Sequence, residues 1–236
     1  MRQYIHKLSN TVIMSPTDTW KLSDVNIKPQ RGWQAAAGLY LNSPSGIWEY
    51  SVEGYYKRMS DYLDYRGGAK LLMNHHIETD VINTQGHAYG VELQVKKQVG
   101  KLNGWMSYTY SRTFLRQNDK RIEKPVNNGD WYPTEYDKPH DFKFVGNYKF
   151  THRYSMSINV DYSTGRPTTI PAGQYYDEST QSMRVYYTER NSYRIPDYFR
   201  TDISFNIEPS HHLTLLTHSS ISVSYTHLTL PTTPYV

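Results

Sequence analysis

The stretch HAYGVELQVKKQVGKLNGWMSYTYSRT, His87 to Thr113, decides the fold. Apolar residues take every second position on both sides of a short break, first over 89–95 and then over 106–110, with polar or small residues such as Glu92 and Thr109 between them. A period of two is typical of a β-strand with one apolar face. The stretch therefore predicts two successive strands, each with an apolar and a polar face. A soluble sheet would have this pattern, and so would a wall between lipid and water.

The composition narrows the class of protein. Mean hydropathy is −0.74 over 236 residues, and no stretch approaches the ~18 consecutive apolar residues of a transmembrane helix. The 23 tyrosines against 6 phenylalanines suit interfaces, because tyrosine has an apolar body and a polar tip. The absence of cysteine excludes a disulfide framework and a thiolate metal site. A net charge of +4, with no basic stripe, gives little support for nucleic-acid binding.

The same alternation recurs along the chain and predicts about nine antiparallel strands. It is clear in 33–41, 48–56, 142–150, 154–162 and 199–207, and weaker in 4–13 and 213–221. We expect one continuous convex face to carry Phe144, Tyr148, Met156, Ile158 and Phe205. We expect the concave face to carry Glu92, Lys143, Asn159 and Asp202.

Strand and connection lengths favour a membrane barrel. Most strands have about ten residues, which crosses a bilayer when tilted, whereas sandwich strands average nearer ~5–6. The short turns NSPSG, VGKLNG and THR alternate with long excursions, so we expect the two kinds at opposite rims. The charged residues of the polar face suit a wet lumen. The alternative is a soluble β-sandwich with the apolar face in its core.

The two ends of the chain differ from the rest of the sequence. The first residues contain no apolar signal segment, so either the protein is cytoplasmic or Met1 is not the true start. The tail VSYTHLTLPTT, Val223 to Thr233, resembles a translated sequencing-library adapter. We therefore expect a partial barrel domain over 1–221, open on its own, and a non-native tail over 222–236.

Enzymatic signals are weak, and we expect no catalysis and no cofactor. His75-His76 and His211-His212 are adjacent pairs whose rings would point to opposite faces of a strand. HHIETD lacks the helical spacing of a zinc motif, and neither GxSxG nor a phosphate-binding glycine loop occurs. No metal site is predicted.

The long loops are the candidate ligand-binding region. They are rich in aromatic residues and arginine, which often anchor binding surfaces. The contact candidates are Trp131, Tyr132, Tyr175, Tyr176, Arg184 and Tyr193. The alternative is that these residues pack the loops together or lie in an outer aromatic belt. On the polar face, Tyr40, Tyr55 and Trp105 would be able to touch a domain in the lumen.

Five segments in order carry a family resemblance. They are IKPQRGWQAAAGLYLN, EYSVEGYYKRMSDYLDYRGGA, AYGVELQVKKQVGKLNGWMSYTYSR, DKPHDFKFVGNYKF and YSTGRPTTIPAGQY. Together they resemble the C-terminal half of the barrel of TonB-dependent outer-membrane transporters, over about Gln3 to Ile221. The resemblance implies a 22-stranded barrel in outer-membrane lipid, a plug domain in its lumen, and a periplasmic segment that engages TonB.

The resemblance implies import of a scarce solute, such as a chelated metal, a cofactor or an oligomer, into a Gram-negative cell. Binding outside and pulling by TonB would displace the plug. This chain would supply wall and extracellular loops and would not transport alone. Two alternatives remain at this stage: a passive porin or adhesin barrel, and a secreted glycan-binding β-sandwich.

Overall fold

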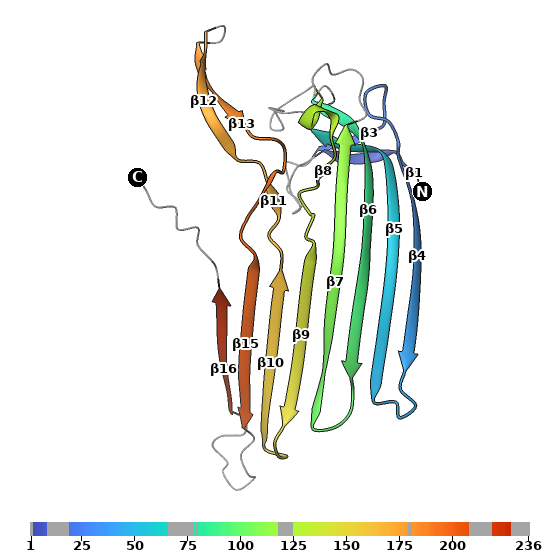
Figure 1. Cartoon of the computed structure of the whole chain (residues 1–236), viewed down its shortest axis with the longest axis vertical. Coiled ribbons are helices and arrows are strands. Elements are labelled where there is room, and N and C mark those ends of the chain that lie inside the picture. Colours follow the sequence, from blue (N-terminus) through green and yellow to red (C-terminus); the bar gives the residue numbers. More distant parts are fainter. Residues whose placement is uncertain are drawn as a thin grey trace.

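The chain forms an all-β, antiparallel open sheet. The computed structural model describes residues 2–8, 19–65, 78, 80–117, 125–178, 181–207 and 219–227. Along the sheet, the order is β1 (Arg2–Gln3), β4 (Gln30–Asn42), β5 (Trp48–Tyr65), β6 (Val81–Lys97), β7 (Leu102–Gln117), β9 (His140–Lys149), β10 (Tyr154–Ser163), β15 (Tyr198–Ile207) and β16 (Ser219–His227). The two end strands do not pair with each other, so the sheet is open, as predicted (Figure 1). No helix among the described residues has the length and apolar character that a membrane crossing needs.

Several short strands and one tight turn lie at one end of this sheet. They are the pairs β2 (Ile5–Leu8) with β3 (Thr19–Leu22), β11 (Pro167–Thr168) with β14 (Tyr193–Arg194), and β12 (Pro171–Asp177) with β13 (Ser182–Tyr187). In addition, β8 (Tyr132–Pro133) pairs with β7 beyond β9, and η2 (Val126–Gly129) is a single tight turn. The β12–β13 hairpin rises above the rest of the molecule (Figure 1).

Strand register places the predicted apolar residues on one face. Met106 lies opposite Phe144, Phe144 opposite Val160, and Val160 opposite Thr201. Since directly opposed residues share a face and the side-chain period is two, this row fixes the face of every neighbouring row. Phe144, Tyr148, Met156, Ile158 and Phe205 share this apolar face, and Glu92, Lys143, Asn159 and Asp202 share the polar face.

The apolar face is not covered by a second sheet. Leu39 is 70% exposed, Leu93 40% and Phe205 46%. The buried apolar residues among those described are few and include Ile82, Leu115 and Tyr132, near the ends of the long strands. A β-sandwich buries its apolar faces against each other. This arrangement contradicts the sandwich alternative.

Aromatic residues mark both edges of the apolar face. Trp48 and Tyr56 are eight positions apart (48 to 56), and the same spacing separates Phe142 from Phe150 and Tyr154 from Tyr162. Eight residues span about 26 Å along a strand. At the usual tilt of about 35–45° this length spans about 20 Å of height, comparable to the ~25 Å apolar band between the aromatic girdles of membrane barrels. We call this region the apolar band.

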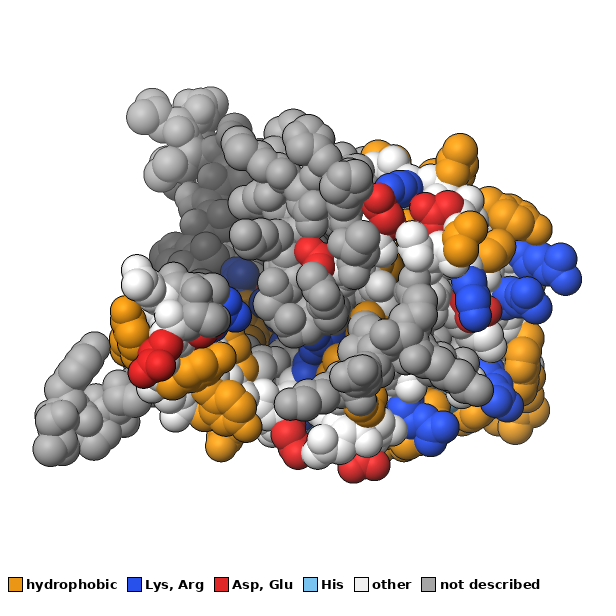
Figure 2. Space-filling view, turned by 90° about the horizontal axis from the view of Figure 1, so that it is seen from above, with side chains coloured by type: hydrophobic (Ala, Val, Ile, Leu, Met, Phe, Trp, Pro, Cys, Tyr) orange, Lys and Arg blue, Asp and Glu red, His pale blue; other side chains and the backbone are white. Residues whose placement is uncertain are grey.

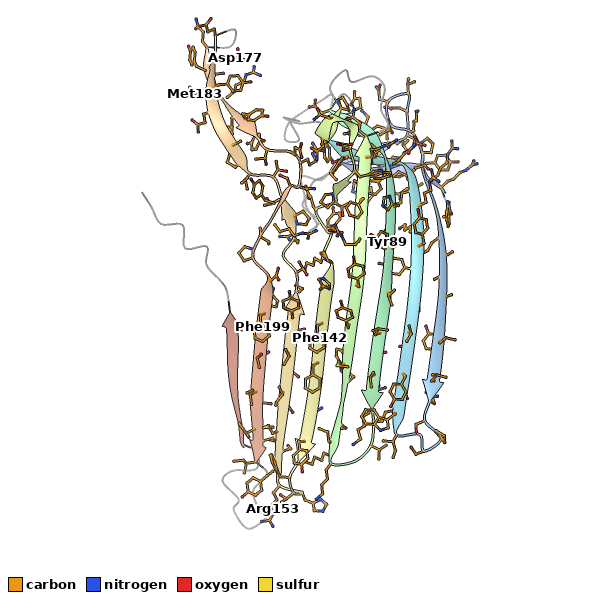
Figure 3. The ribbon with its side chains drawn as sticks, viewed as in Figure 1. Tyr89, Phe142, Arg153, Asp177, Met183 and Phe199 are labelled. Atoms are coloured by element: carbon orange, nitrogen blue, oxygen red, sulfur yellow. The ribbon has the colours of Figure 1, made fainter. Side chains whose placement is uncertain are left out.

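The upper aromatic edge runs obliquely across the sheet. Leu93, which lies four positions along β6 from Tyr89, shares its row with Phe142 and Phe199 through the register of β7, β9 and β10. Figure 3 accordingly shows Tyr89 higher in the view than Phe142 and Phe199. Such a stagger is expected for tilted barrel strands.

The short β4–β5, β6–β7 and β9–β10 turns lie at one rim, and the β10–β15 connection with its hairpin lies at the other (Figure 1). At the short-turn rim, the β4–β5 turn is closed by the Ser43 N–H donating to the Trp48 carbonyl (2.8 Å). Gly46 has φ +65° there, a left-handed conformation that favours glycine. The long connections lead to the other rim, which we call the long-loop rim. This arrangement matches the layout expected from connection lengths.

The structure refines the two weaker segments. In place of a single strand over 4–13, Arg2–Gln3 pairs with β4 and Ile5–Leu8 pairs with β3. The break falls at Tyr4, whose carbonyl accepts the Ser23 N–H at 2.8 Å. Residues 9–13 and 213–218 lie outside the described residues. Strand β16 crosses the predicted boundary between 221 and 222, which remains a prediction.

Candidate functional site

Parts of the β7–β9 and β10–β15 connections meet around the extended ends of β5–β7. These strands have 18, 17 and 16 residues, so they continue past the apolar band, whereas β9, β10 and β15 have 10 each. The β7–β9 and β10–β15 connections lie against the extended strand ends. Polar and charged side chains hold this assembly together.

Asp64, near the end of β5, is the centre of the first cluster. Its carboxylate Oδ2 accepts the Tyr132 hydroxyl at 2.5 Å and Nη1 of Arg190 at 2.7 Å. The side chains of Arg190 and Asp64 are only 19% and 22% exposed. The Arg190 guanidinium also lies 5.8 Å from the centre of the Tyr132 ring. One carboxylate thus ties a wall strand to two separate loops.

Burial shapes the titration of this cluster. Burial, and then the Asp64 carboxylate, raise the pKa of Tyr132. Burial raises the pKa of Tyr62 to about 12, with smaller contributions from Tyr136 and Asp64. Burial and the Asp64 charge also raise the pKa of Glu135, against the opposing effect of Arg190 and Arg166. Both phenols therefore stay neutral at physiological pH, and the neutral Tyr132 hydroxyl donates its hydrogen bond to Asp64.

Two asparagines lock the loops to each other. Asn127 Oδ1 accepts the Arg190 N–H at 2.8 Å, and Asn127 Nδ2 donates to the Arg190 carbonyl at 3.1 Å. Asn191, which is buried, donates from Nδ2 to the Pro133 carbonyl at 2.8 Å. Asn127 and Asn191 have φ +48° and +55°, values that asparagine tolerates better than most residues. The two loops therefore form one docked unit.

Asp137 is a second junction, at the point where β9 leaves β7. Its side chain is fully buried and accepts the Thr113 N–H at 2.7 Å and Nε of Arg112 at 3.3 Å. Nη2 of Arg194 donates to the other carboxylate oxygen, and Nη1 of Arg194 donates to the carbonyls of Asp137 (2.7 Å) and Gly165 (3.0 Å). Two arginines thus neutralise one buried carboxylate.

The predicted contact residues do not form a single site. Tyr132 is 1% exposed and belongs to the Asp64 cluster, whereas Trp131 is 42% exposed and packs on His87 with ring centres 4.4 Å apart. Tyr175, Tyr176 and Arg184 lie on the projecting hairpin, near the labelled Asp177 and Met183 of Figure 3. Tyr193 is half exposed in β14 and lies opposite Thr168. Their role in ligand contact remains a prediction.

The residues that organise the rim were missed in the sequence. Asp64 and Arg190 are separated by 126 positions, so no local motif joins them. The many aspartate and arginine residues of the loops indicate ion pairs, but they do not show which aspartate pairs with which arginine. Among the described residues, no group of three or more His, Asp or Glu is placed to hold a metal ion. The two histidine pairs lie outside the described residues.

The polar face of the wall carries a second feature, within the height of the apolar band. Glu53 of β5 lies directly opposite Glu92 of β6, and the Tyr40 hydroxyl donates to Glu53 at 2.8 Å. Tyr55 lies over Gly90, where an added Cβ would come within 2.8 Å of the tyrosine ring. Directly opposed like charges are destabilising, and the neutral Tyr40 hydroxyl does not cancel the charge of Glu53 or Glu92. The pair therefore favours a basic group on the polar side of the sheet.

Comparison with known proteins identifies the family of this chain. The family model described as TonB dependent receptor-like, beta-barrel, matches residues 8–219. No protein with a curated description matches the chain. The matched region includes every long strand from β4 to β15 and both junctions of the rim. The chain belongs to the TonB-dependent receptor β-barrel family.

Proposed function

We propose that this chain forms wall and extracellular loops of an outer-membrane transporter that imports a scarce solute. The solute would be a chelated metal, a cofactor or an oligomer, too large or too dilute for passive pores. The observation that carries the proposal is the docked unit at the long-loop rim of a TonB-dependent receptor barrel. Preorganised loops reduce the ordering cost of binding, which suits capture of a dilute ligand.

The family implies a plug domain and TonB as partners, in the outer membrane. The opposed Glu53 and Glu92 support a plug partner, because a basic plug residue would relieve their repulsion. The proposed plug belongs to the same full-length protein. Neither catalysis nor a resident cofactor forms part of the proposal.

We further propose that residues 1–221 are not competent alone. An open sheet leaves rows of unpaired N–H and C=O groups at its edges, each costing several kcal/mol in lipid. Neighbouring strands of the full receptor would complete the barrel. Folding of 1–221 in detergent should give smeared or aggregated material, and a compact heat-modifiable band would contradict this part.

Energy coupling tests the function. In cells that depend on the full receptor, uptake of its solute should stop when an uncoupler collapses the inner-membrane proton gradient. A strain without TonB should show the same loss, and a strain carrying an unrelated porin serves as the control. Uptake that continues without the gradient and without TonB would support the alternative, a passive porin or adhesin barrel.

A further inference from the structure

A row of arginines lies on the apolar face just beyond the apolar band. Its members are Arg2 of β1, Arg31 of β4, Arg58 of β5, and Arg112 and Arg116 of β7. Register places them on the lipid-facing side, because Arg58 is opposite Trp33 and Arg112 is opposite Tyr89, both residues of the upper aromatic edge. We call these five residues the basic strip. In Figure 2, blue side chains reach the right-hand edge of the molecule beside orange ones.

The basic strip concentrates positive charge. Arg2 lies directly opposite Arg31, and Arg58 directly opposite His87. Burial and the Arg58 charge lower the pKa of His87. Among the described residues, Arg112 is the one member with an ion pair, to Asp137 at 3.3 Å. Like charges placed opposite each other cost stability, so the arrangement favours an anion between them.

Aromatic rings hold two members of the basic strip in place. The Arg112 guanidinium lies 4.5 Å from the centre of the Phe114 ring, and that of Arg116 lies 5.4 Å from the Trp131 ring. Arg112 is also paired with Asp137, so it mainly fixes the position of the strip, whereas a stacked arginine such as Arg116 keeps its N–H groups available for a phosphate. Arg58 and Arg116 are both exposed. The strip thus presents oriented donors at the edge of the lipid-facing surface.

Directly beyond the aromatic edge, the positive charge lies on β1–β7. At the corresponding positions of β9, β10 and β15 the chain has His140, Thr164 and Asp197, and the basic residues Lys138 and Arg166 come only two residues farther on. At the height of the headgroups the charge is therefore densest on β1–β7.

We propose that the basic strip binds the phosphorylated headgroup of an anionic lipid in the outer leaflet of the outer membrane. The basic strip directly adjoins the apolar band. The acyl chains of a bound lipid would therefore lie on the apolar band while its headgroup lies at the basic strip. Each arginine near a lipid surface contributes about fivefold in affinity for an anionic headgroup. The proposal rests on the membrane orientation given under the proposed function.

Native mass spectrometry of the full receptor tests this proposal. The receptor is purified in a neutral detergent and titrated with lipid A, whose headgroup is phosphorylated, or with zwitterionic phosphatidylcholine. Arg58→Gln should lower lipid A affinity about fivefold, and Arg58→Gln with Arg116→Gln about 30-fold. Phosphatidylcholine binding should not change, and Arg58→Lys should retain most of the affinity.

Two matched controls use exposed arginines elsewhere. Arg153→Gln at the short-turn rim and Arg184→Gln on the projecting hairpin should leave lipid A binding unchanged. The proposal would be overturned if the double variant bound lipid A as tightly as the wild type, or if Arg153→Gln lost as much affinity as the double variant. It would also be overturned if the wild type did not prefer lipid A over phosphatidylcholine. Displacement of lipid A by an equal concentration of inorganic phosphate would do the same, since it would show a simple anion site. Solute uptake is measured separately, so a failure of transport is distinguishable from a failure of lipid binding.

Discussion

Removing the Asp64 charge should release the docked loops. In Asp64→Asn the mostly buried Arg190 loses its counterion, and the short Tyr132 hydrogen bond (2.5 Å) loses its charged acceptor. Breaking a buried ion pair costs about 3–5 kcal/mol, and the exposure of about a fifth on each side reduces this to about 2–3 kcal/mol. The open population of the loops should therefore rise about 30- to 150-fold.

Hydrogen exchange in the full receptor measures this opening directly. The reporting amides are those of Arg190, bonded to Asn127; Asn191, bonded to Thr169; and Thr134, bonded to the Thr113 carbonyl. Their exchange should accelerate by the stated factor in Asp64→Asn. Amides in the β6–β7 ladder within the apolar band should be unchanged, which shows that the barrel is intact.

Two further variants calibrate the result. Tyr132→Phe removes one hydrogen bond to a charged group and keeps the ring, so about 1.5–2 kcal/mol, or about 10- to 30-fold faster exchange, is expected. Arg184→Gln breaks the pair with Asp177 (2.6 Å) on the hairpin, where Arg184 is half exposed, and should not change these amides. Unchanged exchange in Asp64→Asn, or an equal effect of Arg184→Gln, would refute the role given to the Asp64 cluster.

Three other predictions concern the lumen, pH and orientation. Glu53→Gln should weaken retention of the plug by about 1 kcal/mol, so that the plug is released at a lower urea concentration. Glu49→Gln should not change this concentration, because the partner of Glu49 is Lys96 in the wall, at 3.5 Å. Equal effects of the two variants would contradict a plug contact. Asp197 accepts the Tyr162 hydroxyl (2.6 Å) and the Gly165 N–H (2.9 Å), and these bonds lower its pKa below 3.8. The stabilisation by these two hydrogen bonds is therefore complete above pH 3.8 and is lost as the pH falls through the lowered pKa of Asp197. Protease cleavage at Gly165 should increase at acidic pH in the wild type. Asp197→Asn should remove this pH dependence. On intact cells, a cysteine at Met183 should react with an impermeant label and one at Ser45 should not; the reverse would mean that the orientation is inverted.

The alternation of the strands was predictable because it is local. The face of Met156 or Ile158 follows from neighbours two positions away, and the register of the sheet only extends the pattern. The true lengths of β5–β7 were less accessible. Past the apolar band a bulge between Met59 and Tyr62, with Asp61 at φ +56°, shifts the register, so the period of two is interrupted although pairing continues.

The rim could not be predicted residue by residue. Aromatic enrichment correctly drew attention to the loops, but it does not distinguish an exposed side chain such as Tyr176 from the buried Tyr132. That difference depends on Asp64 and Arg190, which meet only in the folded chain. The basic strip has the same origin, because its arginines come from four strands and are aligned by register.

The central claim is that one face of this sheet contacts lipid and the other contacts water. A nitroxide scan along β10, from Tyr154 to Tyr162, in the full receptor in bilayers tests it most directly. Collision with oxygen, which dissolves in lipid, should peak at 154, 156, 158, 160 and 162. Collision with a water-soluble nickel chelate should be low at those positions and higher at 155, 157, 159 and 161. Protection of the first set from both reagents, as in a dry core between two sheets, would contradict the account.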